Sequence, residues 1–203
     1  MKRIIFATGN KDKMREIREI MGDLPVEILS RKEAGLAGEA EEDGESFQEN
    51  AVIKAKYCRS ILQDDRENTI IMADDSGLVI DALNGEPGIY SARYMGEDTS
   101  YRLKNANLIG RLSGVPEEKR TARFVCAIAA VLPDETVLTA VGTIEGKIGY
   151  EERGKNGFGY DPIFYLPDMS CSTAELPPEE KNKISHRGNA LRAMRKQLEK
   201  YFE

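Results

Sequence analysis

The sequence predicts an α/β fold in which helices flank a mixed central β-sheet. The apolar run at residues 4–7 leads directly into an amphipathic helical pattern, and the buried run at residues 69–73 has the length of a second strand. Residues 123–132 and 136–144 are two further strand-like runs around a Pro-Asp-Glu turn, which predicts a long hairpin. Helices mixed with parallel-type and hairpin strands favour a mixed sheet.

The segment at residues 8–13, between the first strand and the first helix, predicts a phosphate-binding turn. Apolar residues at helical spacing from Met14 to Met21 predict the helix, and Gly22 stands where it should end. Such a turn directs backbone N–H groups and a positive helix end at a ligand, and two lysines add charge. The segment matches neither glycine-rich phosphate motif, so an ordinary turn with solvated lysines stays as the alternative.

The next elements are a short strand at residues 26–29, a Gly/Ala/Glu-rich loop and a second helix. Ser46 and Glu49 have the spacing of a capping box, so this helix should begin there. Asn50 and Lys54 are four residues apart and share a face of the helix that is separate from its apolar face.

Asp74 and Asp75 are the first candidates for chemistry. They follow the buried strand at residues 69–73 and lead into Ser76-Gly77, a pair that favours a turn. Because neighbouring strand residues point to opposite faces, only one aspartate should face a ligand unless the turn has begun. A carboxylate there can bind Mg²⁺ or act as a base on water. The alternative is that both aspartates cap the turn.

The acidic run at residues 39–49 offers a second oxygen ligand for a metal, from Glu41 or Glu42. Mg²⁺ needs only one or two protein carboxylates when substrate phosphates complete its coordination. Acidic runs are otherwise commonly solvated faces.

The last third of the chain holds a glycine-rich loop at residues 154–162 and a final helix that starts near His186. Phe158 and Tyr160 offer rings on which a nucleobase can stack, or alternatively rings that fill the core. His186 is the only histidine and adjoins Arg187, so a donor-rich patch is expected there. A further helix is expected at residues 100–112.

Composition excludes several functional classes. The 203 residues carry a net charge of −6 and no Lys/Arg block, so duplex nucleic acid is not an expected partner. No apolar stretch predicts a membrane span or a signal peptide. Three cysteines without a C-x-x-C pair disfavour a zinc site and disulfides and favour the cytoplasm. A single histidine without G-x-S-x-G disfavours a Ser-His-Asp hydrolase.

Five motifs occur in order and are spread over essentially the whole chain. They are Thr8-Gly9-Asn10-x-x-Lys13, Asp74-Asp75-Ser76-Gly77-Leu78, Pro87-Gly88-Ile89-Tyr90-Ser91-Ala92-Arg93-Tyr94, Gly157-Phe158-Gly159-Tyr160-Asp161-Pro162 and Ser185-His186-Arg187-Gly188. Together these motifs resemble the inosine triphosphate pyrophosphatase family. Asn156 departs from the glycine found in many members, but asparagine tolerates a left-handed turn.

The resemblance implies one pyrophosphatase domain over residues 1–203, an elongated subunit with two lobes and an active-site cleft between them, and assembly as a homodimer. It implies hydrolysis of ITP, dITP and XTP to the monophosphate and pyrophosphate with one Mg²⁺ ion per subunit. Asp75 would be the general base, and Asp75 with Glu41 or Glu42 would hold the metal. The substrate-binding residues implied are Thr8, Gly9, Asn10, Lys11, Asp12, Lys13, Lys54, Ser76, Phe158, Gly159, Tyr160, Asp161, Lys181, His186 and Arg187.

Two other functions stay open at this stage. One is a related Maf-like nucleotide pyrophosphatase that acts on modified pyrimidines or other bases. The other is a nucleotide sensor that binds in the same pocket without hydrolysis.

Overall fold

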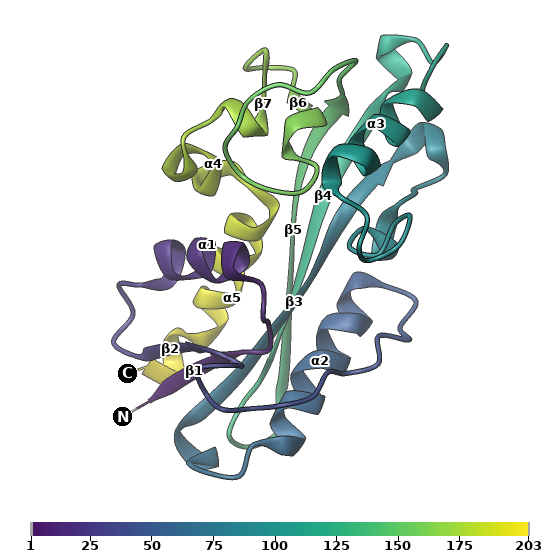
Figure 1. Cartoon of the computed structure of the whole chain (residues 1–203). Helices are drawn as coiled ribbons and strands as arrows, with labels where there is room; N and C mark the ends of the chain where they lie inside the picture. Colours follow the sequence, from purple (N-terminus) through teal and green to yellow (C-terminus); the bar gives the residue numbers. More distant parts are fainter. Residues whose placement is uncertain (1, 203) are drawn as a thin grey trace. The chain divides into compact units, whose positions relative to one another are not determined.

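The computed structural model describes residues 2–202 and divides into two compact units (Figure 1). Unit 1 contains the chain up to Asp75, Cys126–Gly142 and the chain from His186 on, and unit 2 contains Ser76–Val125 and Thr143–Ser185. The helices are α1 (Lys11–Met21), α2 (Phe47–Ile61), α3 (Tyr101–Arg111), α4 (Pro178–Ile184) and α5 (His186–Phe202). The strands are β1 (Arg3–Phe6), β2 (Glu27–Ser30), β3 (Thr69–Ile80), β4 (Thr121–Val131), β5 (Val137–Ile148), β6 (Phe164–Leu166) and β7 (Cys171–Ser172).

The strands form a mixed sheet in the order β2-β1-β3-β4-β5-β6-β7. β1 runs parallel to both β2 and β3, with Phe6 opposite Ser30 on one side and Met72 on the other. β5 and β6 pair antiparallel, as do β6 and β7. The predicted α/β fold with a mixed sheet is confirmed, including the β4–β5 hairpin.

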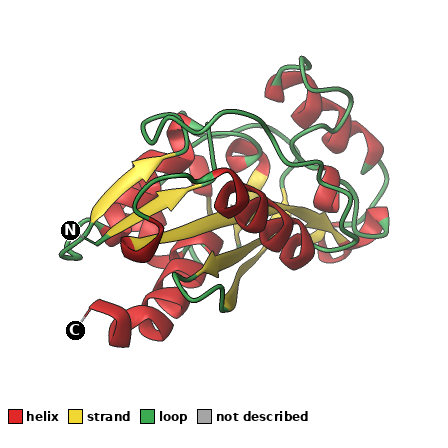
Figure 2. Cartoon of the chain, turned by 90° about the horizontal axis from the view of Figure 1, so that it is seen from below, coloured by secondary structure: helices red, strands yellow, loops and turns green. Residues whose placement is uncertain are grey.

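Helices cover both faces of the strands in unit 1, and the alternation along β3 shows how. Ile70 and Met72 belong to a core that includes the apolar faces of α1 and α5. Ile71 and Ala73, one position along, belong to a second core with α2. Figure 2 shows the strands in yellow with red helices on either side. Successive β3 residues therefore face different helices.

Unit 2 has a core of its own, built from α3, β6 and the unit's parts of β3, β4 and β5. Leu108 of α3 and Phe164 of β6 are fully buried in it, and the rings of Phe124 and Phe164 lie 4.4 Å apart between centroids. No helix among residues 2–202 has the length and apolarity needed to cross a bilayer.

One local prediction is wrong. Asp74-Asp75-Ser76-Gly77 is not a turn, because β3 continues unbroken through these residues to Ile80. Asp, Ser and Gly favour turns in isolation, but here both aspartates are buried with cationic partners, which keeps the strand extended beyond Met72, where its pairing with β1 ends. The other expected helices and strands lie within a few residues of their predicted positions.

Candidate active site

The predicted site residues fall into two groups, one in each unit. Unit 1 contains Thr8, Gly9, Asn10, Lys11, Asp12, Lys13, Glu41, Glu42, Lys54, Asp75, His186 and Arg187. Unit 2 contains Ser76, Phe158, Gly159, Tyr160, Asp161 and Lys181.

The centre of the unit 1 group is the pair of buried carboxylates on β3. Asp74 Oδ2 lies 2.9 Å from Lys13 Nζ and 3.4 Å from a terminal guanidinium nitrogen of Arg187, so it faces α1 and α5. Asp75 Oδ1 lies 3.0 Å from Lys54 Nζ and faces α2. The opposite-face geometry expected of neighbouring strand residues is thus present, and each face supplies its own cations.

These surroundings move the two carboxyl pKa values apart. Burial alone would raise the pKa of Asp74, but Lys13, Arg187 and Lys54 together hold it well below its usual range. Burial raises the pKa of Asp75 above its usual range, because Lys54 and Lys13 oppose the effect only in part. Carboxylates with separated pKa values take different roles, and the one with the higher pKa is the better proton acceptor. Asp75 therefore has the character of a base, and Asp74 that of a permanent anion.

Arg187 lies deeper than sequence analysis expected. Its guanidinium is buried, donates to Glu16 Oε2 and approaches Asp74. Glu16 is itself 4% exposed on α1 and is not among the predicted site residues. In the sequence, the only sign that Glu16 is buried was its position directly before Ile17, which belongs to the apolar face of α1. The arginine therefore belongs to the carboxylate centre of unit 1.

The turn at residues 8–13 is held by its own side chains. Asn10 is the N-cap of α1, and its Oδ1 accepts hydrogen bonds from the amides of Asp12 (2.9 Å) and Lys13 (3.0 Å). Thr8 Oγ1 accepts a bond from the Asn10 amide at 3.2 Å. Two amides that were expected to face a ligand are thus already used. What the turn clearly presents is Lys13, whose side chain points back along the helix to Asp74.

Two unit 1 carboxylates fit a divalent cation. Glu42 Oε2 and Asp75 Oδ1 lie 3.4 Å and 3.0 Å from the same Lys54 ammonium, so both face one cationic position. Glu41 is exposed and has no such contact. Within residues 2–202 no three His, Cys, Asp or Glu side chains gather as a metal site. A pair of carboxylates is nevertheless what Mg²⁺ needs when phosphates supply the other ligands.

The unit 2 group is organised by Asp161, which is 2% exposed. Its Oδ2 accepts bonds from the Phe158 amide at 2.9 Å and from Lys181 Nζ at 2.6 Å, and its Oδ1 accepts one from Thr173 Oγ1 at 2.8 Å. Gly157 has φ +71°, and a Cβ there would lie 2.2 Å from Asp161 Oδ2, so the loop requires glycine. Asp161 therefore fixes both the loop and Lys181.

The two aromatic residues of this loop differ. Tyr160 is 4% exposed, its hydroxyl donates to the Ser91 carbonyl at 2.6 Å, and its ring meets Tyr101 edge-on. Tyr160 thus fills the core, as the alternative interpretation held. Phe158 is half-buried, with Lys181 Nζ 5.1 Å from its ring centroid. It is the ring that can stack on a base.

The model of the Ham1 family matches residues 4–197. The chain belongs to the Ham1 family.

Related proteins match the sequence over essentially its whole length. This chain is 43% identical over 203 residues to a dITP/XTP pyrophosphatase of Listeria monocytogenes, and the match covers 100% of this chain and 98% of that protein. It is 45% identical over 199 residues to a dITP/XTP pyrophosphatase of Bacillus subtilis, covering 98% of each. The solved Ham1 structure from Staphylococcus aureus superposes with a TM-score of 0.86 at 39% identity, covering 98% of this chain and 100% of that one. The predicted family, fold and enzyme class, a nucleoside triphosphate pyrophosphatase, are confirmed.

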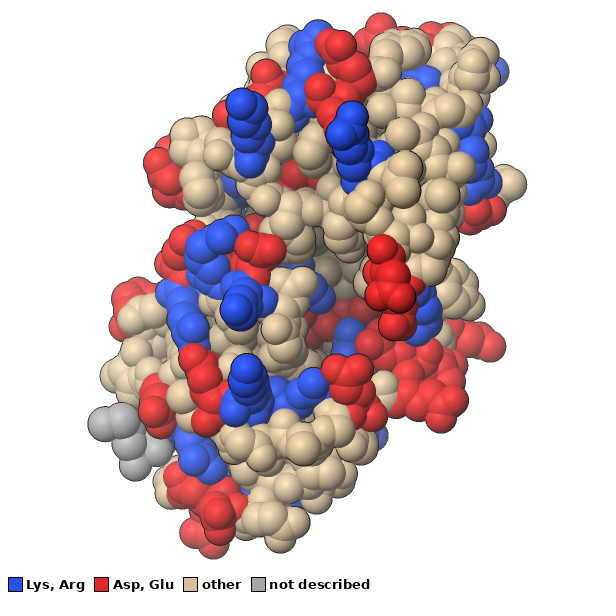
Figure 3. Space-filling model, viewed as in Figure 1, with Lys and Arg blue, Asp and Glu red and all other residues tan. Residues whose placement is uncertain are grey.

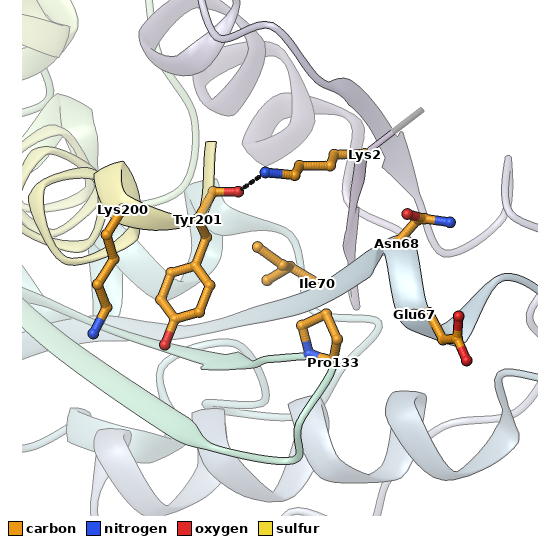
Figure 4. A pocket seen from close by; sticks show the side chains of 7 residues that line it. All are labelled: Lys2, Glu67, Asn68, Ile70, Pro133, Lys200 and Tyr201. Carbon is orange, nitrogen blue, oxygen red and sulfur yellow. Dashed lines mark hydrogen bonds between the residues drawn. The ribbon is translucent and has the colours of Figure 1, made fainter. Parts of the chain in front are cut away.

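Unit 1 of this Ham1 chain also has a pocket of about 300 Å³ that contains none of the predicted site residues (Figure 4). It is lined by Lys2, Glu67, Asn68, Ile70, Pro133, Lys200 and Tyr201. Ile70 is the second residue of β3, whereas Asp74 and Asp75 lie four and five positions further on. At about 3.3 Å per strand residue this is well over 10 Å away. The pocket is therefore separate from the carboxylate centre.

Proposed function

We propose that this enzyme hydrolyses dITP, XTP and ITP to the corresponding monophosphate and pyrophosphate. The observation that carries the proposal is the buried Asp74–Asp75 pair, whose pKa values are driven apart beside Lys13 and Lys54. A base and two ammonium groups are what hydrolysis of a triphosphate requires, because this chemistry needs positioning and charge stabilisation more than covalent help. The names of the Listeria and Bacillus relatives support the choice of substrate.

In this proposal Asp75 accepts a proton from the water that attacks the α-phosphorus, and pyrophosphate leaves. Lys13 and Lys54 neutralise phosphate oxygens. Mg²⁺ would be held by Asp75 and Glu42, and when bound it supplies positive charge at the phosphates. Glu42 is favoured over Glu41 because its carboxylate lies 3.4 Å from the Lys54 ammonium. Asp74 keeps Lys13 oriented and stays ionised throughout.

We assign purine recognition to the loop at residues 157–161, with His186 as a further donor. Phe158 stacks on the base, while Lys181 and loop amides donate to the 6-oxo group that hypoxanthine and xanthine carry. Adenine has a 6-amino donor there, which would leave those donors unpaired. A polar site can reject such a near-isostere by factors of up to about 10⁴–10⁵. Arg187 is assigned to the carboxylate centre of unit 1, where it contacts Glu16 and Asp74, and not to base recognition.

The test is pyrophosphate release from dITP, XTP, ITP, ATP and GTP with Mg²⁺, for the wild type, Asp75→Asn and the exposed control Asp134→Asn. Cleavage of the first three substrates in preference to ATP, lost only in Asp75→Asn, is expected. Equal cleavage of all five would refute the base recognition, and full activity of Asp75→Asn would refute the base assignment. Binding of ITP without hydrolysis would indicate a sensor, and preference for modified pyrimidine nucleotides a Maf-like enzyme.

We also propose that the enzyme is a cytoplasmic homodimer that binds a small nucleotide and no nucleic acid. The dimer rests on the family resemblance, and the location rests on the three free cysteines, Cys58, Cys126 and Cys171. Sedimentation at the mass of one chain would contradict the dimer.

A further inference from the structure

Asn50 is a buried polar residue to which the proposed mechanism gives no part. It lies on α2 with a fully buried side chain, one turn before Lys54. Its Nδ2 donates to Asp75 Oδ2 at 3.3 Å, and its Oδ1 accepts a bond from the Gly44 amide at 2.9 Å. Because Gly44 offers a donor and Asp75 only acceptors, the amide has a single orientation that satisfies both.

The two partners of Asn50 belong to two different segments. Asp75 lies on β3, and Gly44 lies in the acidic loop before α2, two residues after Glu42. Figure 3 shows acidic side chains gathered where this loop lies in Figure 1. Glu42 reaches the same Lys54 ammonium as Asp75 does. The Asn50 amide therefore bridges the two segments that carry the carboxylates.

We propose that Asn50 is a positioning residue: by bonding Asp75 and Gly44 together, it sets the spacing of Asp75 and Glu42 and thereby the affinity for a divalent cation. The proposal rests on the function proposed above. Removal of a residue that orients metal ligands typically lowers metal affinity roughly 10–100-fold.

Asparagine suits this position better than its alternatives. An apolar side chain would leave the Gly44 amide and one Asp75 oxygen without this partner. An aspartate could accept from Gly44 but would face Asp75 with a like charge. The neutral amide supplies one donor and one acceptor and adds no charge where Asp75, Glu42 and Lys54 already meet.

Gly44 gives an independent way to break the bridge. A Cβ on Gly44 would lie 2.7 Å from Asn50 Oδ1 and 2.8 Å from the Glu49 Cβ, so Gly44→Ala must push the loop away from α2. This substitution changes none of the side chains of the proposed site. Gly110→Ala is the matched control, because a Cβ at Gly110 of α3 meets nothing within 4 Å.

The experiment measures Mn²⁺ binding by electron paramagnetic resonance, without nucleotide, in the wild type, Asn50→Ala, Gly44→Ala and Gly110→Ala. We expect the Mn²⁺ dissociation constant to rise roughly 10–100-fold in the first two variants and to stay unchanged in the control. Amide hydrogen exchange should show faster exchange at residue 44 in Asn50→Ala, with the core of β3 still protected.

Wild-type affinity in Gly44→Ala would overturn the proposal, even if Asn50→Ala does not fold. Absence of Mn²⁺ binding by the wild type would overturn it as well. Pyrophosphate release from the nucleotides by the wild type is measured in a separate assay, which tests the proposed function alone. Loss of Mn²⁺ affinity in both variants, in an enzyme that cleaves none of the nucleotides, would support the positioning role and refute the proposed function.

Discussion

Glu16→Gln should destabilise the protein far more than a surface charge change, because it unbalances a buried ion cluster. Two acids, Glu16 and Asp74, face two cations, Arg187 and Lys13. Glu16, Asp74 and Arg187 are 4%, 3% and 2% exposed. The glutamine keeps the shape but removes one negative charge, which leaves the cluster with an excess buried positive charge.

The size of the effect follows from the partners that remain. Breaking a buried pair costs about 3–5 kcal/mol of unfolding free energy. Arg187 keeps Asp74 at 3.4 Å, so the lower end, about 3 kcal/mol, applies. In a chain of this length each kcal/mol shifts Tm by about 2–4 °C, so Tm should fall by roughly 6–12 °C.

The assay is thermal unfolding followed by circular dichroism, with Asp23→Asn as the matched control. Asp23 also pairs with an arginine of α5, Arg195, at 2.7 Å, but on the exposed surface. Exposed pairs contribute little, so the control should hardly change Tm. If Glu16→Gln lowers Tm no more than Asp23→Asn does, the buried cluster stabilises the protein no more than an exposed ion pair does, and the reasoning is refuted.

Three further predictions concern other sites. Hydrogen bonds from Ser30 lower the pKa of Glu33 to about 2, so the ionised carboxylate stabilises the fold above pH 4.5 and loses this effect as the pH falls to about 2. In urea unfolding at several pH values, Glu33→Gln should therefore be less stable than the wild type above pH 4.5 and equally stable near pH 2. Arg120→Leu should cost about 3 kcal/mol in urea unfolding, because the guanidinium donates to three buried carbonyl oxygens at 2.8 Å each. Asp161→Asn should raise KM for dITP more than it lowers kcat, because it weakens the ion pair that holds Lys181 and leaves Asp74 and Asp75 chemically unchanged. An unchanged KM would contradict this.

The longer helices and strands were predictable because hydrophobic period and capping are local signals, whereas the short elements β6, β7 and α4 were not predicted. The stripe from Met14 to Met21 and the Asn10 turn predicted α1 closely, and Asn10 is its N-cap. Ser46 likewise begins α2. The extent of β3 was not predictable, because local propensity at Asp74-Asp75 favours a turn while distant partners keep the strand extended.

The candidate site was predictable in its residue types but not in its pairings. The partner that engages Arg187, Glu16, lies 171 positions away, and no local pattern encodes that contact. Asn50 was visible on the same helix face as Lys54, but its role depends on Gly44 and on Asp75, which only the fold brings to it. Contacts between residues far apart in the sequence could therefore not be predicted from the sequence.

The roles of Asp74 and Asp75 follow from the strand rather than from the residue type. Two identical side chains at adjacent positions would titrate alike in solution. The two-residue period of β3 turns one toward α1 and α5, whose Lys13 and Arg187 approach it, and the other toward α2, where it meets one ammonium and a neutral amide. The first is held ionised, and the second keeps the raised pKa of a proton acceptor. A turn at this place would have lost that distinction, so the uninterrupted strand is itself part of the proposed catalytic design.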